Sequence, residues 1–283
     1  MAFSGSRVVA WPTDRDELIA LQFELAAAAD EVEPWPLPDR LDGLLVEAAF
    51  VTFPTGLHGP GDIGDPAWAA AVVVGAGAGD AVRDQTVVRG FAGAPYEAGL
   101  LALREGALLE AAVGGLEQRP DIVLVDATGR DHPRRAGLAL HLGAILDLPI
   151  VGVTNRLLCA GPDRVAGLGH QRGASTPVLR HAGAEAPSCA PLAGRAAPLS
   201  RSAEPGTGSG WPEIVGYAVR AKAGANPLFA HAAWRTGPET ARALVLATTS
   251  SRARTPAPLR AARTLARIER ARDEGRLPGP RWR

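Results

Sequence analysis

Cysteine, lysine, aromatic residues and long uninterrupted apolar runs are all scarce in this chain of 283 residues. Two cysteines, Cys159 and Cys189, form neither a disulfide framework nor a paired metal-binding motif, so we expect reduced thiols. Lys222 is the only lysine. The longest apolar stretches, 66–79 and 136–153, are interrupted by Gly, Pro, Asp or His and are too short or polar to span a bilayer. The sequence therefore predicts neither a disulfide-stapled scaffold nor a membrane-spanning protein.

Several familiar motifs are also missing. The first 20 residues lack a charged segment followed by an apolar one, so we expect no signal peptide and a cytoplasmic protein. The glycines of GAGAGD (75–80) precede an expected strand rather than a helix, which indicates a hairpin turn and not a dinucleotide site. GTGSG (206–210) lacks the lysine of a phosphate-binding loop. No GxSxG or HExxH sequence is present.

What is present is enough apolar sequence for a sizeable core: 46% of the residues are hydrophobic, which suits one large α/β domain or two small ones. The formal net charge is zero, but it is unevenly spread. Residues 250–283 hold ten arginines against three acidic residues, a local net charge of +7. This segment is either a phosphate-contacting surface or simply a solvated C-terminal helix.

The spacing of apolar residues predicts a mixed α/β fold. The expected helices are 14–31, 97–118, 132–146 and 237–250, and the expected strands are 44–53, 67–75, 85–92, 121–127, 149–155, 213–221 and 226–232. Short Gly-rich turns join the first three strands, which predicts an antiparallel meander. The elements that follow form β-α-β units, which predict parallel pairing.

Residues 161–212 differ in texture from the rest of the chain. They are crowded with Gly, Pro, Ala and Ser and show no sustained periodicity, so we expect a long loop or insertion. Its Ala-, Pro- and Ser-rich half, 184–210, has the composition of a disordered segment.

Two acidic residues stand where a metal-dependent hydrolase would need them. Asp126 closes an apolar strand, and a charge at that place calls for a partner or a metal ion. Glu105 lies on the preceding helix, from which its side chain can face the end of that strand. Carboxylates that hold Mg²⁺ can support phosphodiester hydrolysis. By themselves the two acids are weak signals, because an Asp that ends a strand is often a helix cap.

The surrounding motifs give these acids a context. GLLALREG (99–106), DATGRDHPRRAGLALHLG (126–143) and PIVGVTNRLL (149–158) closely resemble signature segments of the endonuclease V family, whose members nick nucleic acid near deaminated bases. LQFELA (21–26) and EIVGYAVRAKAGANPLF (213–229) resemble its amino-terminal helix and late strand pair. The resemblance covers most of the chain outside the Gly- and Pro-rich insertion and the extreme tail.

The resemblance implies a ribonuclease-H-like mixed sheet flanked by helices, in a single domain over residues 1–260, followed by a basic tail over 261–283. It also implies a Mg²⁺- or Mn²⁺-dependent nuclease of DNA repair that acts on DNA or RNA containing inosine, with the base pocket and the basic tail as contacts. A base must leave the helical stack before its edge can be inspected. The implied roles are metal ligation by Glu105 and Asp126, a wedge that fills the vacated space at Tyr96, and a base pocket lined by Gly99, Leu101, Gly129 and His132.

Three positions depart from the family pattern. Phe50 stands where the family keeps a metal-binding aspartate, Asn155 replaces its lysine, and Trp234 replaces its late histidine. Glu47 points to the opposite face of the strand from Phe50, because strand side chains alternate, and is a poor substitute. His231, three residues before Trp234, is likewise displaced.

Two further residues depart from the family pattern. Glu97, which follows Tyr96, would face phosphates unfavourably, and Ala127 stands where the family keeps a glycine.

Two hypotheses follow. One is a nucleic-acid-binding relative whose activity is impaired or lost, a pseudoenzyme. The alternative is an active nuclease in which Asp62, Asp65 or another group completes the metal site.

Overall fold

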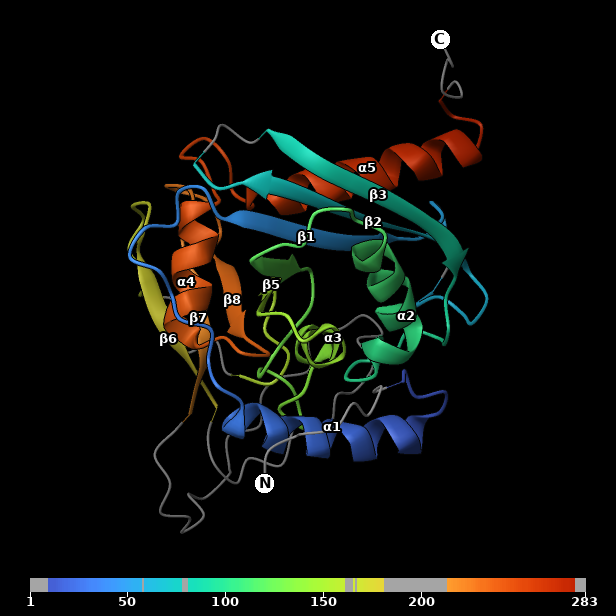
Figure 1. Ribbon diagram of the computed structural model, residues 1–283, viewed down its shortest axis with the longest axis horizontal. Helices are drawn as coiled ribbons and strands as arrows, with labels where there is room; N and C mark the ends of the chain where they lie inside the picture. Colours follow the sequence, from blue (N-terminus) through green and yellow to red (C-terminus); the bar gives the residue numbers. More distant parts are fainter. Residues whose placement is uncertain are drawn as a thin grey trace.

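One mixed sheet with helices on both faces makes up the part of the chain that the computed structural model describes, residues 10–57, 59–77, 81–160, 165, 167–180 and 213–277 (Figure 1). The strands are β1 (Leu45–Thr52), β2 (Pro66–Gly75), β3 (Val82–Phe91), β4 (Ile122–Val125), β5 (Ile150–Thr154), β6 (Ser175–Arg180), β7 (Glu213–Val219) and β8 (Leu228–Ala232). The helices are α1 (Arg15–Glu31), α2 (Leu101–Gly114), α3 (Leu138–Leu146), α4 (Pro238–Ala247) and α5 (Ala257–Asp273). None of these helices is long and apolar enough to cross a membrane.

The strand order across the sheet is β3-β2-β1-β4-β5-β8-β7-β6. The first three strands form the predicted antiparallel meander, and β1, β4 and β5 are parallel to one another. This arrangement confirms the predicted α/β, ribonuclease-H-like fold class. In the register of the central pair, Ala49 of β1 lies opposite Val125 of β4. Phe50 and Asp126, the residues that follow this pair along the chain, therefore lie close together near the carboxyl ends of the two strands.

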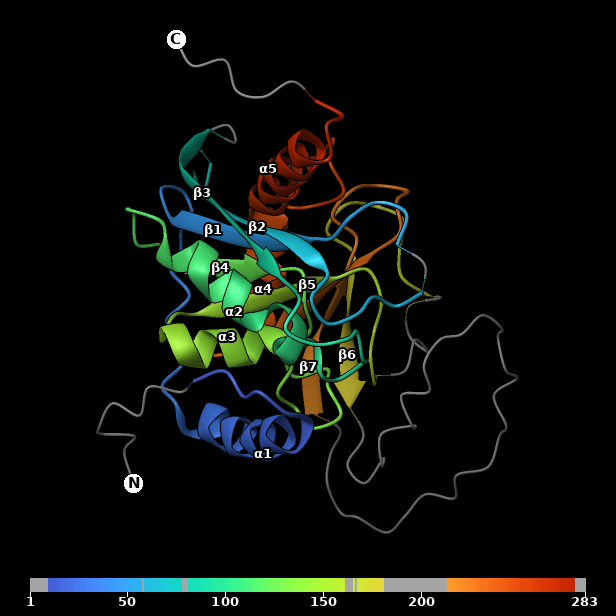
Figure 2. The ribbon, with the colours of Figure 1, turned by 90° about the vertical axis from the view of Figure 1, so that its right-hand side faces the viewer.

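Each face of the sheet has its own apolar core. Ala49 and Val51 of β1 pack with α2 and α3, whereas Val46 and Ala48 pack with α4 and α5. Strand side chains alternate between faces, which is why neighbouring residues of β1 belong to different cores. Helix α1 packs against α2 and α3 as an outer layer, visible in Figure 2.

Two expected helices begin later than the apolar spacing predicts. Helix α2 starts at Leu101 rather than at residue 97, because Gly99 adopts a positive φ of 83° just before it. Helix α3 starts at Leu138, so the expectation of a helix over 132–137 was wrong. Arg135, with a φ of 59°, is in the left-handed region, which a right-handed helix cannot include.

The chain after residue 161 contains more regular structure than the composition suggests. Strand β6 pairs with β7 at one edge of the sheet, so the expectation of an irregular segment was wrong over 175–180. Pro177 is compatible with an edge strand. The segment 184–210 lies outside the described residues. Helix α5 crosses residue 260, where we expected a basic tail to begin, and packs across β1 and β2.

A buried carboxyl group lies inside the core beneath α2. Glu47 of β1 is fully buried, and neither of its side-chain oxygens has a hydrogen-bond partner among the described residues. Burial, with a smaller contribution from the nearby charge of Asp84, raises the pKa of Glu47 to about 8. The side chain is therefore neutral at pH 7, which makes it compatible with an apolar core.

The buried acid makes stability depend on pH. The unfolded chain loses the Glu47 proton near pH 4.5, whereas the folded chain keeps it until about pH 8. Because the folded state binds more protons between these values, stability falls as pH rises through that window, by on the order of 5 kcal/mol. In urea unfolding from pH 4 to pH 9, Glu47→Gln should remove this contribution and leave the fall that Glu105, whose pKa is also raised to about 8, causes over the same window. Substitution of the exposed Glu117 by Gln is the matched control, and an unchanged pH dependence in Glu47→Gln would refute the assignment.

Candidate functional site

Two adjoining pockets open where β1, β4 and β5 end. The carboxylate pocket, about 220 Å³, is lined by Phe50, Glu105 and Asp126. The His132 pocket, about 260 Å³, is lined by Gly99 and His132 among others. Tyr96, Leu101 and Asp126 line both pockets. The carboxyl ends of parallel strands are the common place for ligand sites in α/β folds, because the connecting loops gather there.

Two acids, Glu105 and Asp126, line the same carboxylate pocket. The pKa of Glu105 is raised to about 8, mainly by burial; the Arg104 charge opposes the rise and the Asp126 carboxylate adds to it. Burial also raises the pKa of Asp126, against the opposing effect of Arg263. Glu105 therefore keeps its proton near neutral pH, and the Arg263 guanidinium favours the charged form of Asp126.

That cation is an arginine of α5. Nη2 of Arg263 donates to Oδ2 of Asp126 at 2.9 Å, and both side chains are about three-quarters buried. The guanidinium carbon of Arg263 lies 5.1 Å from the centre of the Phe50 ring, a distance at which a cation is attracted to the aromatic face. Phe50 and Arg263 thus occupy the side of Asp126 on which a third carboxylate would be needed.

The residues present do not fit a metal ion held by carboxylates. Among the described residues, no three His, Cys, Asp or Glu side chains lie close enough together to hold a metal. Glu105 and Asp126 are only two ligands, and a guanidinium already binds one of them. Mg²⁺ demands a near-octahedral set of oxygen ligands, which this pair does not supply.

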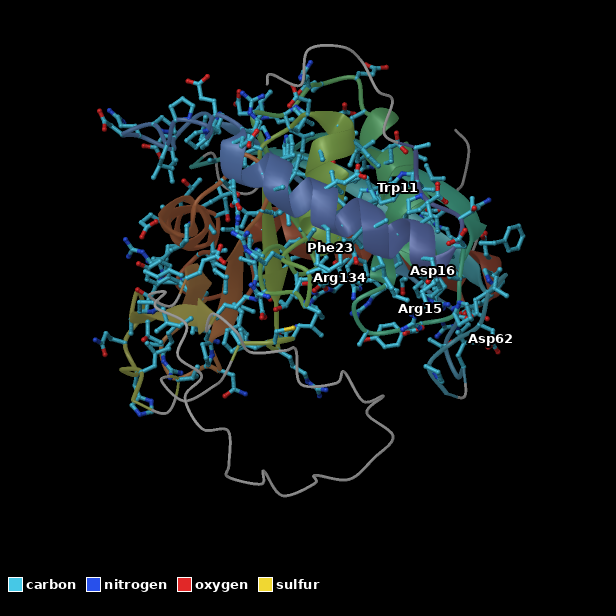
Figure 3. The ribbon with its side chains drawn as sticks, turned by 90° about the horizontal axis from the view of Figure 1, so that it is seen from below. Trp11, Arg15, Asp16, Phe23, Asp62 and Arg134 are labelled. Atoms are coloured by element: carbon cyan, nitrogen blue, oxygen red, sulfur yellow. The ribbon has the colours of Figure 1, made fainter. Side chains whose placement is uncertain are left out.

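Neither suggested replacement carboxylate reaches the pocket. Oδ2 of Asp65 accepts from Arg104 at 2.8 Å and from the backbone N–H of Asp62 at 2.8 Å. Arg104 also donates to the carbonyl of Asp62 at 2.9 Å, so this loop is fixed against α2. Asp62 itself is exposed on a peripheral loop, as Figure 3 shows. Neither aspartate lines the carboxylate pocket.

The structure brings four of the five residues predicted for base recognition and wedging to the His132 pocket. They are Tyr96, Gly99, Leu101 and His132. Tyr96 is 50% exposed at the rim, which leaves its ring free to stack. Gly129 does not line the pocket: a Cβ at that position would lie 2.1 Å from the carbonyl oxygen of Ala232, so its glycine is required by close packing on β8.

The backbone carbonyl of Gly99 accepts three side-chain hydrogen bonds beside this pocket. It accepts from Nε2 of His132 at 3.0 Å, from Nη2 of Arg134 at 2.9 Å and from Nε2 of Gln22 at 3.2 Å. Arg134, which lies beside the middle of α1 in Figure 3, also donates to the Gln22 side chain and so connects the Gly99 loop to that helix. Because Nδ1 of His132 accepts from the Arg134 backbone N–H, the ring carries its proton on Nε2.

His132 is held in its neutral form. Burial and, to a smaller extent, the charge of Arg134 lower its pKa to about 3, although the hydrogen bond to Gly99 acts in the opposite direction. A neutral ring with a fixed tautomer positions the Gly99 carbonyl without adding charge to the pocket.

Asp131 anchors the loop after β5, which forms the far wall of the His132 pocket. Its carboxylate is fully buried and accepts from the backbone N–H groups of Leu158, Cys159 and Ala160 at 2.8–3.0 Å. Three charge-assisted hydrogen bonds to one carboxylate give this loop a defined path.

Removing the Asp131 carboxylate should destabilise the loop that contains residues 158–160. We expect Asp131→Ala to cost about 2–4 kcal/mol of unfolding free energy, because three donors lose their acceptor. Hydrogen exchange at residues 158–160 should speed up in the native state. Asp131→Asn keeps one acceptor oxygen and should lose less, whereas Asp39→Ala, at an exposed position, should change nothing. Unaltered exchange at 158–160 in Asp131→Ala would contradict this role.

The other altered positions also lie away from the two acids. Asn155 is exposed, although its neighbours Thr154 and Arg156 line the His132 pocket. Trp234 packs on α3, where its Nε1 donates to Asp147 at 3.4 Å. His231 is fully buried and its Nε2 lies 2.8 Å from Oγ1 of Thr154, so it does not replace the missing histidine beside Asp126.

Glu97 and Ala127, the remaining departures, both line the His132 pocket. Glu97 forms an exposed ion pair with Arg15 of α1 at 2.5 Å, so its charge is balanced rather than left facing the pocket alone. Ala127 is buried, and its methyl group narrows the pocket at that point.

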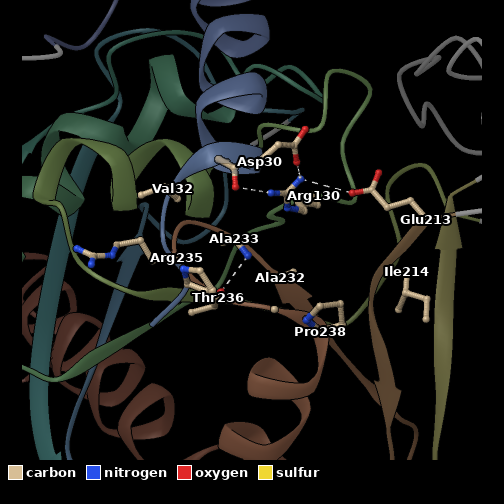
Figure 4. A pocket seen from close by; sticks show the side chains of 13 residues that line it. Asp30, Val32, Arg130, Glu213, Ile214, Ala232, Ala233, Arg235, Thr236 and Pro238 are labelled. Atoms are coloured by element: carbon tan, nitrogen blue, oxygen red, sulfur yellow. Dashed lines mark hydrogen bonds and ion pairs between the residues drawn. The ribbon is translucent and has the colours of Figure 1, made fainter. Parts of the chain in front are cut away.

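A further hollow of about 340 Å³ lies between the end of α1 and the start of α4 (Figure 4). Its charges satisfy one another: Arg130 contacts Asp30 at 2.5 Å and Glu213 at 3.4 Å, and Arg135 contacts the same two acids at 2.8 Å each. None of the predicted site residues lines this hollow.

Sequence reasoning missed Arg263, Gln22, Arg134 and Asp131. Arg263 lies 137 residues after Asp126, and only the packing of α5 on the sheet brings the two together. Asp131 and Arg134 stand in the DHPRR segment beside His132, which was a usable signal. Gln22 was detectable as the polar residue on the inner face of an otherwise apolar helix stripe.

The fold and the acids at the carboxyl end of its central parallel strands define an α/β protein with a ribonuclease-H-like sheet. The chain belongs to the Endonuclease V family, whose model matches residues 61–264. It is 34% identical over 244 residues to an Endonuclease V from Streptomyces coelicolor, an alignment that covers 84% of each chain. With two other curated Endonuclease V relatives, the match spans 57% and 60% of the relative's length.

Solved structures agree with this assignment. The crystal structure of Endonuclease V from Streptomyces avermitilis superposes with a TM-score of 0.69 at 29% identity and covers 95% of this chain and 97% of that one. Endonuclease V from Ciona intestinalis has the same fold, with a TM-score of 0.62 at 20% identity, covering 91% and 98% of the two chains. That structure is a complex with a 24mer DNA containing an inosine followed by a ribo-adenosine.

Proposed function

We propose that this chain binds DNA or RNA containing a deaminated base such as inosine, and that its capacity to hydrolyse a phosphodiester is impaired or lost. The observation that carries the proposal is the contact of Arg263 with Asp126 beside Phe50, next to an intact His132 pocket. A metal ion at such a site would polarise the phosphate and activate a water molecule. This chain offers two carboxyl groups for that purpose, one protonated and one bound to arginine.

Base binding is supported by the pocket's construction. The exposed ring of Tyr96 at the rim can stack in the space that an extruded base leaves. The pocket behind it combines the apolar Leu101 and Leu138 with polar groups such as Thr154. A few polar groups in a mostly apolar cavity fix the orientation of a planar ligand.

The alternative is an active Mg²⁺- or Mn²⁺-dependent endonuclease of DNA repair with a rebuilt third ligand. Family membership favours it. It requires a third carboxylate beside Glu105 and Asp126. Asp65, one candidate for that place, is instead bound to Arg104.

Oligonucleotide binding tests the first half of the proposal. We expect the protein to bind a fluorescent inosine-containing single strand in EDTA. Tyr96→Ala should weaken binding about tenfold, because stacking on one base contributes about 1–3 kcal/mol. Tyr96→Phe keeps the ring and should bind like the parent protein. Equal binding of the Tyr96→Ala variant would remove the wedge role.

Restoring the missing ligand tests the second half. The parent protein should not nick the inosine strand with Mn²⁺, whereas Phe50→Asp combined with Arg263→Ala should gain Mn²⁺-dependent nicking. The double variant supplies a third carboxylate and removes the competing guanidinium. Adding Asp126→Ala to the double variant is the control and should abolish the gain. Nicking by the parent protein that Asp126→Ala removes would establish the alternative.

A further inference from the structure

Three arginines of α5 lie beside the end of β1 and its Phe50 ring, which lines the carboxylate pocket. Arg263, Arg267 and Arg270 are spaced by four and three residues, which places them on one face of the helix. That face lies over the end of β1, because Arg263 reaches the Phe50 ring and Arg270 reaches Thr52. The helix therefore presents a row of cations where the sheet presents Phe50.

The outer two arginines of the row are anchored to the protein. Arg263 binds Asp126, and Nη1 of Arg270 donates to Oγ1 of Thr52 at 3.0 Å and to the carbonyl of Phe53 at 2.8 Å. Both also carry a buried Nε without an acceptor among the described residues. Arg263 and Arg270 are thus held in place by the protein.

Arg267 differs from its two neighbours. It is exposed, its guanidinium carbon lies 6.0 Å from the Phe50 ring centre, and it makes no hydrogen bond or ion pair with a residue that the structure describes. Partial desolvation and the charges of Arg263 and Arg270 lower its pKa. Crowding of like charges costs free energy that an anion would recover.

We propose that Arg267, supported by Arg263 and Phe50, is a metal-independent site for a phosphodiester group of bound nucleic acid. This inference rests on the proposed function and deepens it. Arg263 neutralises Asp126, so that a phosphate can approach without facing a bare carboxylate. The two pockets share Tyr96 and Leu101, so a strand whose base enters the His132 pocket brings its backbone past this site. Arginine suits the task because its planar fork matches phosphate oxygens.

The test measures binding of a fluorescent inosine-containing single strand in EDTA over a series of salt concentrations. Arg267→Ala should weaken binding about fivefold and lower the slope of log K against log salt by about 0.7 to 1, the signature of one lost phosphate contact. Arg272→Ala is the matched control: it removes one charge from the same helix, at a residue paired with Glu269 away from the pocket. The control should change binding less than twofold.

Arg263→Gln supplies a second variant, because it leaves the Asp126 charge uncompensated. It should weaken binding more in EDTA than in Mn²⁺, and its melting temperature shows whether the fold is retained. Parent-like affinity and salt slope in Arg267→Ala would overturn the inference, as would a parent protein that binds only when Mg²⁺ or Mn²⁺ is present. If the parent protein bound no inosine strand in either condition, the proposed function itself would fail.

Discussion

Helix α5 brings Arg263 to within 2.9 Å of Asp126, and the electrostatics of the site follow from that contact. Two acids in a partly buried pocket repel one another, and burial penalises the charge of each. This protein resolves both costs internally: Glu105 keeps its proton up to about pH 8, and Asp126 shares its charge with a guanidinium. The pocket is balanced by its own side chains, without a metal ion.

The sheet makes this balance possible through its register. Because β1 and β4 are parallel with Ala49 opposite Val125, the residues that follow, Phe50 and Asp126, are neighbours. An aspartate in place of Phe50 would add a third carboxyl group, whose negative charge would need a metal. The face of the Phe50 ring, which carries partial negative charge, instead attracts the Arg263 guanidinium. The Phe50 position and the α5 arginine are therefore coupled features of one site.

Much of this arrangement was predictable from the sequence, and the failures have physical causes. Apolar periodicity predicted the meander and the parallel strands, since each has a strongly apolar run with a clear boundary. It failed at residues 132–137, where a left-handed Arg135 ends any helix, and at β6, whose pairing depends on a distant strand. Alternation along β1 predicted that Glu47 and Phe50 point to opposite faces of the sheet, as they do, whereas the contact of Arg263 with Asp126 was not predictable.

The residues around the His132 pocket also divide into those that a sequence pattern predicts and those that it does not. Gly129 was expected at the base pocket, but its lack of a side chain serves contact with β8, which no local pattern reveals. Asp131 and Gln22 act through hydrogen bonds to backbone groups of remote segments. Such contacts depend on the tertiary path of the chain, and periodicity carries no information about them.

The most direct test of an internally balanced carboxylate pocket is a titration of the free protein with Mn²⁺, followed by electron paramagnetic resonance. The account predicts no saturable binding at millimolar Mn²⁺, and the same featureless result for Asp126→Asn. Stoichiometric binding by the parent protein that Asp126→Asn abolishes would contradict it, because a metal ion would then displace Arg263 from its place.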